Sequence, residues 1–318
     1  MELQETIKAG MRPAKKARLG KLARHEERQF YLFISLWIIG FILFDAGPIV
    51  ASLIVSFTNW SLLEAPKWIG IANYQKMIGD QFFYVAIWNS LYYGIASVGL
   101  GLIVSFLLAL LLNQKVPGIA LFRTIFYLPS VVSGIAVAIL WIMILNADYG
   151  LLNTALYWFG IKGPAWLIQP QWTKPALILM SLWQGAGASM VIYLAGLQSV
   201  PVHLYEAAEI DGAGPWGKFW NVTVPMMSPI IFYNLIVGFI ASLQGFVLVL
   251  IMTTDGRPAN AALMIGLYLY RQAFVFFNVG YASAIAWVLF LIIVLIALAN
   301  YFLTSRIART PAVKVKNK

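Results

Sequence analysis

Residues 206–225 read EAAEIDGAGPWGKFWNVTVP, a polar stretch in a largely apolar chain. The stretch carries three acids close together (Glu206, Glu209 and Asp211), and a glycine-rich turn follows them. On both sides lie hydrophobic runs long enough to cross a bilayer. We therefore expect a loop that faces one aqueous side of a membrane, where it is a candidate docking surface.

The composition supports a membrane protein. Of 318 residues, 61% are hydrophobic and 11% are charged, and the mean hydropathy is +0.80. A globular protein must cover its outside with polar groups, so a soluble core does not need this much apolar side chain. The apolar runs do not alternate as the strands of a transmembrane barrel would. The predicted fold class is an all-α polytopic membrane protein.

Six apolar runs reach the roughly 20 residues that a helix needs to cross about 30 Å of hydrocarbon. Asp45 interrupts the first run, and we place it in the outer half, near the interface. Pro129 should kink the third span, because proline removes one backbone hydrogen bond. The small residues at 185–189 should let helices approach closely. The predicted spans of this 29–305 membrane domain are 30–57, 84–112, 121–145, 176–198, 229–253 and 281–303.

The basic residues set the orientation. Two tails (1–28 and 306–318), the connection at 113–123 and the 206–225 loop hold 16 of the 22 Lys and Arg. Because positive residues stay on the cytosolic side, we expect both termini and the polar loop in the cytosol. The N-terminal tail is either a helix on anionic lipid or a disordered segment. The net charge of +10 is explained by topology, and no nucleic-acid partner is expected.

Two familiar kinds of site are not expected on this chain. Cysteine is absent and the two histidines are far apart, which argues against a metal site. Gly212, Gly217 and Lys218 have the spacing of a phosphate-binding loop. However, Phe219 stands where that loop needs Ser or Thr, and no strand precedes it.

The polar loop, taken as 199–228, should contain two short helices. We expect Ser199 to cap a first helix that runs to about Asp211, with Gly212 as its stop. A second helix should begin at Pro215, since proline is favoured in a first turn. Pro225 would then mark the return to the membrane.

The loop resembles a known family motif. Glu206-Ala207-Ala208, Gly212 and VTVP at 222–225 fit the EAA loop of binding-protein-dependent ABC importer permeases, although the two valines are usually Ile and Leu there. The chain from about Phe30 to Arg306 is similar to the carbohydrate-uptake branch, the maltose and glycerol-phosphate type. Segments that carry this similarity include SFTNW (56–60), IGIANY (69–74), LFRTIFYLP (121–129), DYGLLN (148–153), YLAGLQSVP (193–201) and YASA (281–284).

The resemblance implies the type I ABC importer permease fold and a permease subunit of an ATP-driven sugar importer. In that family the first loop helix is a coupling helix, and its Glu pairs with an Arg of a cytosolic ATPase. Glu206 would be this anchor. Glu209 and Asp211 either join the surface or are simply solvated. The coupling residues carried over are Glu206, Ala207, Ala208, Asp211 and Gly212.

The resemblance also implies partners and a location. The partners are a second permease subunit in a heterodimer, two copies of the ATPase, an extracytoplasmic sugar-binding protein and the lipid bilayer. ATP and Mg would be bound by the ATPase subunits, so no cofactor and no catalytic residue is expected in this chain. The location is a bacterial plasma (inner) membrane, and the outer loops at 146–175 and 254–279 should contact the binding protein.

A sugar path needs hydrogen-bonding groups inside the bundle. The predicted path residues are Gln184, Ser242 and Gln244, with Asn89, Ser130 and Ser133 behind them. The alternative for each is a hydrogen bond between helices. A secondary active transporter of a small polar solute is the alternative function. It would usually carry an ionisable residue at mid-depth, and only Asp45 comes near.

Overall fold

The computed structural model describes residues 21–253 and 256–308, so most of both basic tails lies outside the described residues. Within these ranges the chain is helical and contains no β-strand. Five of the described helices are long and apolar enough to cross a membrane, or six if one bent pair counts as a single span. The chain divides into two compact units, residues 1–54 and 55–318.

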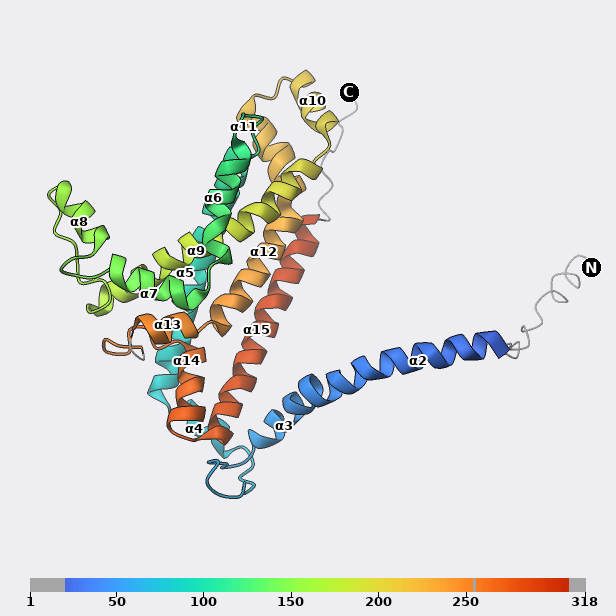
Figure 1. The fold of residues 1–318 in the computed structure, drawn as a ribbon, viewed down its shortest axis with the longest axis vertical. Helices are drawn as coiled ribbons and strands as arrows, with labels where there is room; N and C mark the ends of the chain where they lie inside the picture. The colour runs from blue at the N-terminus through green and yellow to red at the C-terminus, as the bar shows by residue number, and fades with distance from the viewer. Residues whose placement is uncertain (1–20, 254–255, 309–318) are drawn as a thin grey trace, which may run out of the picture. The chain divides into compact units, whose positions relative to one another are not determined.

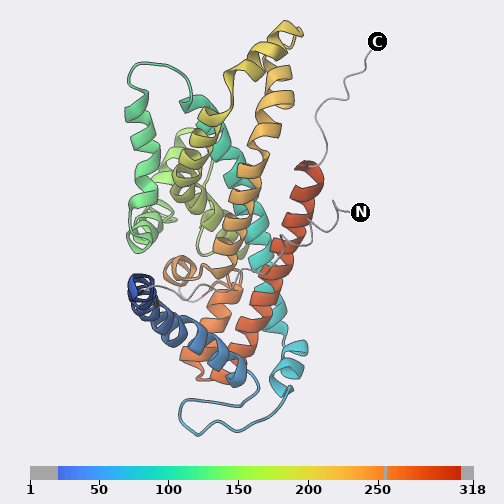
Figure 2. The same cartoon turned by 90° about the vertical axis from the view of Figure 1, so that its right-hand side faces the viewer.

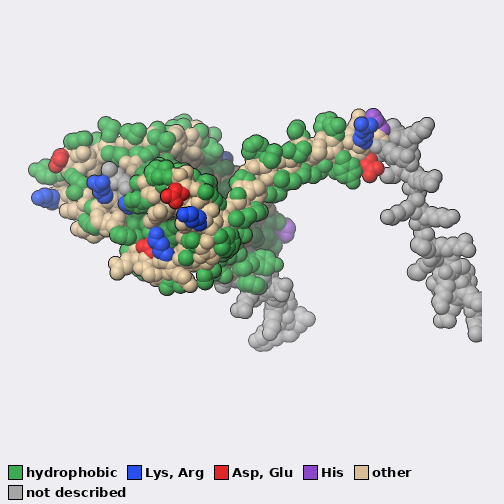
Figure 3. All heavy atoms as spheres, turned by 90° about the horizontal axis from the view of Figure 1, so that it is seen from below, with side chains coloured by type: hydrophobic (Ala, Val, Ile, Leu, Met, Phe, Trp, Pro, Cys, Tyr) green, Lys and Arg blue, Asp and Glu red, His purple; other side chains and the backbone are tan. Residues whose placement is uncertain are grey.

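The first unit is one apolar helix. α2 (Lys21–Phe41) passes through a π-helical turn (Ile42–Ala46) into α3 (Gly47–Val55). Residues 21–28, predicted as part of the tail, are helical, and Pro48 does not break the helix because the π-helical turn precedes it. In Figure 3 hydrophobic side chains run along this helix, and charged side chains with a histidine gather at its N-terminal end.

Four long helices form the bundle of the second unit (Figures 1 and 2). α5 packs against α9 along much of its length and also against α12, and α12 packs against α15. Their side chains pack into two apolar core clusters, one of which lies at the end of the bundle near residues 200–227. The four helices are α5 (Gln81–Leu112), α9 (Pro170–Ser199), α12 (Val224–Gln244) and α15 (Val279–Ala308).

The third predicted span is bent much more sharply than a proline kink. α6 (Ile119–Val131) contains Pro129, and α7 (Gly134–Ile144) follows at an angle of 98°. α6 lies close to α9: a Cβ added to Gly187 would lie 2.2 Å from the carbonyl oxygen of Phe126. The small-residue cluster therefore permits close helix packing, as predicted.

The fifth span differs from its prediction at both ends. α11 (Pro215–Lys218), a π-helical turn (Phe219–Thr223) and α12 form one continuous membrane-length helix, Pro215–Gln244. The second loop helix is therefore not separate from the span: Pro225 does not break the helix, because the π-helical turn Phe219–Thr223 precedes it. The helix stops at Gly245, and α13 (Val247–Met252) follows as a short separate piece.

The predicted outer loops contain further short helices. These are α4 (Ala72–Ile78), α8 (Leu151–Trp158) and α14 (Ile265–Tyr270), which continues into a π-helical turn (Arg271–Val275).

Asp80 connects three of these elements at one end of the bundle. It caps α5 through the backbone N–H of Phe82 and Phe83, and the hydroxyls of Tyr268 and Tyr281 donate to its carboxylate. Partial burial alone would raise the pKa of Asp80, but these four hydrogen bonds outweigh it and the pKa is lowered. Burial, together with the carboxylate, raises the pKa of the Tyr268 hydroxyl.

Candidate functional site

The first loop helix, α10 (Val202–Ile210), ends in a Schellman turn. Gly212 has φ = +81°, the N–H of Ala213 donates to Ala208 O (2.8 Å), and the N–H of Gly212 donates to Glu209 O (3.0 Å). Gly212 is thus the stop that the sequence predicts. The predicted cap is wrong: Ser199 is the last residue of α9, and its hydroxyl donates to Gly196 O.

One face of α10 packs on its own bundle. Leu204, Tyr205 and Ala208 lie against the second core cluster, and the Tyr205 hydroxyl is 3.1 Å from that of Thr223. Ala207 is exposed. The structure therefore separates the two alanines of the EAA motif: Ala207 is accessible to a partner, while Ala208 allows close packing within the chain.

The acids of the loop differ in their partners. Glu209 pairs with Lys218 at 2.6 Å across the glycine turn, and this ion pair lowers the pKa of Glu209. Glu206 and Asp211 are exposed, and neither forms an ion pair with a side chain of residues 25–253 or 256–302. Glu206 is therefore available to a cation of another protein.

The same loop exposes large apolar side chains that were not among the predicted coupling residues. Ile210 is 87% exposed and Trp216 is 76% exposed, and Val202 and Trp220 are also on the surface. The loop occupies one end of the bundle (Figure 1). Exposed aromatic and aliphatic groups around a polar motif are typical of a protein-binding surface.

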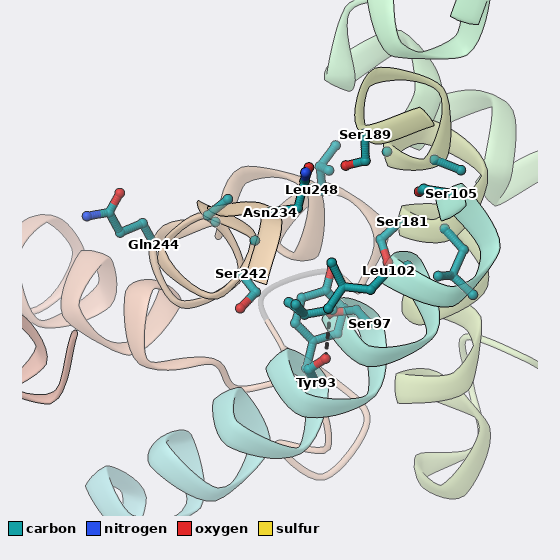
Figure 4. Close-up of a pocket in the computed structure, with 18 of the residues that line it drawn as sticks. Tyr93, Ser97, Leu102, Ser105, Ser181, Ser189, Asn234, Ser242, Gln244 and Leu248 are labelled. Carbon is teal, nitrogen blue, oxygen red and sulfur yellow. Dashed lines mark hydrogen bonds between the residues drawn. The ribbon is translucent and has the colours of Figure 1, made fainter. Parts of the chain in front are cut away.

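A pocket of about 420 Å³ lies between α5, α9, α12 and α13 (Figure 4). All of its lining side chains are uncharged, and many are small. The polar lining residues are Tyr93, Ser97, Ser105, Ser181, Ser189, Asn234, Ser242 and Gln244.

Four of these polar groups already donate a hydrogen bond to the backbone of their own helix. The hydroxyls of Ser97, Ser181 and Ser242 donate to carbonyls of their own helices at 2.6–2.9 Å. The Asn234 amide nitrogen likewise donates to Ile230 O at 2.9 Å. The three serines still offer oxygen lone pairs, and Asn234 still offers its amide oxygen and one N–H. Such groups suit a ligand that donates hydrogen bonds, as the hydroxyls of a sugar do.

Ser105 differs from the other serines of the pocket. It is 1% exposed, and its hydroxyl has no hydrogen-bond partner among the described residues. An unpaired buried hydroxyl costs free energy, so Ser105 is the group that gains most from a polar ligand or a water molecule in this pocket.

The predicted path residues are only partly brought together. Ser242 and Gln244 line the pocket, although in Figure 4 the Gln244 amide points away from the other labelled side chains. Gln184 is not among the lining residues; its amide lies beside Gly134, at the start of α7. Ser130 and Ser133 lie at the end of α6 and just before α7, and also outside the lining.

Asn89 has protein partners for its whole amide. It is 3% exposed, and its nitrogen donates to Asn260 O (2.9 Å) and Leu263 O (3.2 Å). Its oxygen accepts from Lys174 Nζ at 2.8 Å. Asn89 thus anchors the segment before α14, and we do not place it in the path.

The pocket has a signal in the sequence that the six predicted path residues do not reflect. Small or polar residues recur every four positions, and this spacing keeps them on one face of a helix. The three rows are Tyr93, Ser97, Gly101 and Ser105 on α5; Ser181, Gly185 and Ser189 on α9; and Asn234, Gly238 and Ser242 on α12.

Comparison with known proteins identifies the family. Residues 97–309 match the model of the binding-protein-dependent transport system inner membrane component. The chain belongs to this family. It is 42% identical to a probable ABC transporter permease protein, YesP, of Bacillus subtilis, over 84% of this chain and 87% of that one. It is 32% identical to the lactose transport system permease protein LacF of Rhizobium radiobacter, over 88% and 95%.

A solved structure supports the same fold for this family member. It is a bacterial alginate ABC transporter in complex with an alginate pentasaccharide-bound periplasmic protein, and the TM-score is 0.78. The identity is 26%, and the match covers 92% of this chain and 99% of that one. The type I ABC importer permease fold is thereby confirmed, and an importer permease is favoured over a secondary active transporter.

Proposed function

We propose that this chain is one of two different permease subunits of an ATP-driven sugar importer in a bacterial plasma membrane, with both termini in the cytosol. The sugar would pass through the pocket between α5, α9 and α12. Two copies of a cytosolic ATPase would dock at the 199–228 loop. ATP and Mg would be bound by those subunits, and this chain would contribute no group to ATP chemistry.

One observation carries this proposal most directly: the loop and the pocket share a helix. The continuous helix Pro215–Gln244 begins in the loop and supplies Asn234 and Ser242 to the pocket. The contact between the Tyr205 and Thr223 hydroxyls, with a smaller contribution from the Glu209–Lys218 ion pair, connects α10 to the start of the same helix. A push on α10 can therefore reach the pocket through one rigid element, as a switching transition requires.

The proposed mechanism is alternating access. Closure of the ATPase subunits on ATP would draw the two permease loops together and open the bundle outward to accept sugar. Hydrolysis would reset it. Glu206 would fix the register of the docked ATPase through an ion pair with an Arg, since such pairs set specificity at an interface.

The sugar-binding protein would dock on the outer segments. A second pocket of about 430 Å³ joins the two predicted outer loops and is lined by Asn146, Trp166, Thr253 and Arg257, among others. An aromatic ring and a cation in a concave surface suit a protruding segment of a protein partner. The lactose permease relative, and the alginate complex with its periplasmic protein, support this assignment.

The test is reconstitution. The chain is tagged in its native host and extracted in mild detergent, and the co-purifying proteins are identified and placed in proteoliposomes with the binding protein. We expect a second permease and an ATPase to co-purify, and labelled sugar uptake to require ATP. Uptake by the chain alone, driven by an ion gradient without ATP, would overturn the proposal in favour of a secondary transporter.

A further inference from the structure

Three aromatic rings connect the pocket to the surface of the second unit. The ring of Phe246 lines the pocket and stacks on Tyr270, with ring centroids 5.2 Å apart, and the ring of Tyr270 lies 5.3 Å from that of Phe274. Phe246 and Tyr270 are half-buried, and Phe274 is 62% exposed. Tyr270 ends α14, which lies at the end of the bundle away from α10 (Figure 1). This aromatic row is therefore continuous from the pocket lining to the surface.

The spacing of residues along α14 and its π-helical turn produces the row. Gly266, Tyr270 and Phe274 are four positions apart, which keeps them close to one face of the helix. Gly266 lets Phe246 approach this face: a Cβ at Gly266 would lie 3.3 Å from the Phe246 Cβ and 3.3 Å from the Gln244 carbonyl oxygen. A larger residue at position 266 would push Phe246 away, so glycine is what allows the row to reach the pocket.

The opposite face of α14 holds the row in place. Tyr268 is two positions from Tyr270, or about 200° around the helix axis. Its hydroxyl donates to the Asp80 carboxylate and accepts from the Gln272 amide nitrogen at 2.9 Å. Tyr268 and Gln272 are both buried. The aromatic row is thus presented by a segment that a buried polar network fixes from behind, and a ligand that stacks on it has little ordering entropy to overcome.

A sugar suits such a row. One face of a pyranose ring carries mainly C–H groups, which pack on an aromatic ring, while its hydroxyls project from the edge. Rings that only anchored the protein in lipid would not need to stack inward, one on the next, as far as the pocket lining. A protein partner would cover the exposed Phe274 and would not explain the half-buried Phe246.

We propose that Phe274, Tyr270 and Phe246 form an aromatic track along which a pyranose sugar passes between the extracytoplasmic end of the bundle and the pocket. This inference rests on the proposed function, which makes the pocket part of the sugar path. Phe274 contacts the sugar first and Tyr270 next, and Phe246 contacts it as it reaches the serine and asparagine oxygens of the pocket. Each contact is weak and resembles the next, so the sugar moves without a deep trap.

The test measures sugars imported per ATP hydrolysed. Proteoliposomes that hold the complete complex receive the binding protein loaded with the tritium-labelled sugar that it carries, identified beforehand by mass spectrometry. We expect Tyr270→Leu to lower the ratio about 3- to 10-fold and Phe274→Leu about 2- to 5-fold, because more cycles end without sugar in the pocket. ATP hydrolysis itself should stay unchanged, since neither substitution touches the 199–228 loop.

Two further variants serve as controls. Tyr270→Phe keeps the ring and should retain the wild-type ratio within about twofold. Phe277→Leu should leave the ratio unchanged, because Phe277 is 45% exposed in the same segment but lies outside the row. Phe274→Leu alone decides the outcome if Tyr270→Leu fails to assemble, since the Phe274 side chain is exposed.

A wild-type ratio in both leucine variants of the row would overturn the proposal. An equal fall of uptake and ATP hydrolysis would also overturn it, because the rings would then contact a protein partner or only support the fold. So would an equally large effect of Phe277→Leu, which would indicate a general apolar surface. Failure of the proposed function is distinct from these outcomes, since the wild-type complex would then show no ATP-dependent uptake.

Discussion

The 199–228 loop and the pocket between α5, α9 and α12 use their polar groups in opposite ways. In the loop, Glu206 is exposed and forms no ion pair among the described residues, and it lies on a helix whose inner face is fixed by Tyr205 and Ala208. In the pocket, three of the five serine hydroxyls donate within their own helices, and their lone pairs remain. The loop is suited to a charged protein partner, and the pocket to an uncharged face of hydroxyl groups.

This difference assigns the tight binding of a protein partner to the loop and the passage of a weakly bound substrate to the pocket. A charged anchor at the loop can hold a partner through many cycles. Backbone-committed serines bind a sugar only weakly, which suits a site that must also release it. Variants in the two regions should therefore fail in different ways.

Glu206→Lys should have the largest effect. Reversal of the anchor charge should lower sugar uptake at least about 30-fold, since loss of one partner of a buried charge pair costs about 2–5 kcal/mol. The variant should still insert and fold, because Glu206 is exposed. Uptake and ATPase co-purification are measured together, and normal uptake would remove Glu206 from the coupling surface.

Gly187→Ala should destabilise the wall beside the pocket. The added Cβ would meet the backbone of Phe126 and Tyr127, which cannot rotate away, so we expect a loss of about 1–3 kcal/mol. Gly185→Ala is the matched control, because a Cβ there meets no atom within 4 Å. Thermal unfolding in detergent distinguishes them. Equal stability of the two variants would show that α6 does not pack closely on α9.

Ser105→Ala should separate binding from stability. Removal of its unpaired hydroxyl should leave stability unchanged or raise it by up to about 1 kcal/mol. If sugar bonds to this hydroxyl, the apparent KM for uptake should rise about 2- to 10-fold. Gln184→Ala, outside the pocket lining, is the control and should leave the KM unchanged. If the KM rises with Gln184→Ala and not with Ser105→Ala, the sugar does not pass through this pocket.

Glu209→Gln should have the smallest effect. The Glu209–Lys218 pair is exposed, and exposed pairs contribute little, so uptake should change less than about twofold. Because the pKa of Glu209 is lowered in the folded protein, its small contribution is present above the unfolded pKa and is lost as the pH falls through the folded pKa. Amide exchange of α10 between about pH 7 and pH 3 would show this. A contribution that grows on acidification would contradict the pairing.

The loop could be predicted from the sequence because its features are local. Gly212 stops α10 by its own backbone conformation, and the spacing from Glu206 is short. The lining of the pocket was harder to predict, because its side chains come from three separate helices. The rotation of each helix about its axis decides which of its side chains face the pocket. Asn89 and Gln184 are polar and lie in spans, yet neither lines the pocket. The 98° bend after α6 was also missed, since Pro129 indicates a weak point and not an angle.

The most direct test of the link between loop and pocket uses the cysteine-free chain. Ser189→Cys places one thiol in the pocket lining. A membrane-impermeant maleimide is added to proteoliposomes that hold the complete complex, on the side of the membrane that the extracytoplasmic face of the complex occupies. We predict that trapping the ATPase with ATP and vanadate increases labelling, and that Glu206→Lys in the same chain abolishes the increase. Equal labelling with and without ATP would contradict coupling between the loop and the pocket.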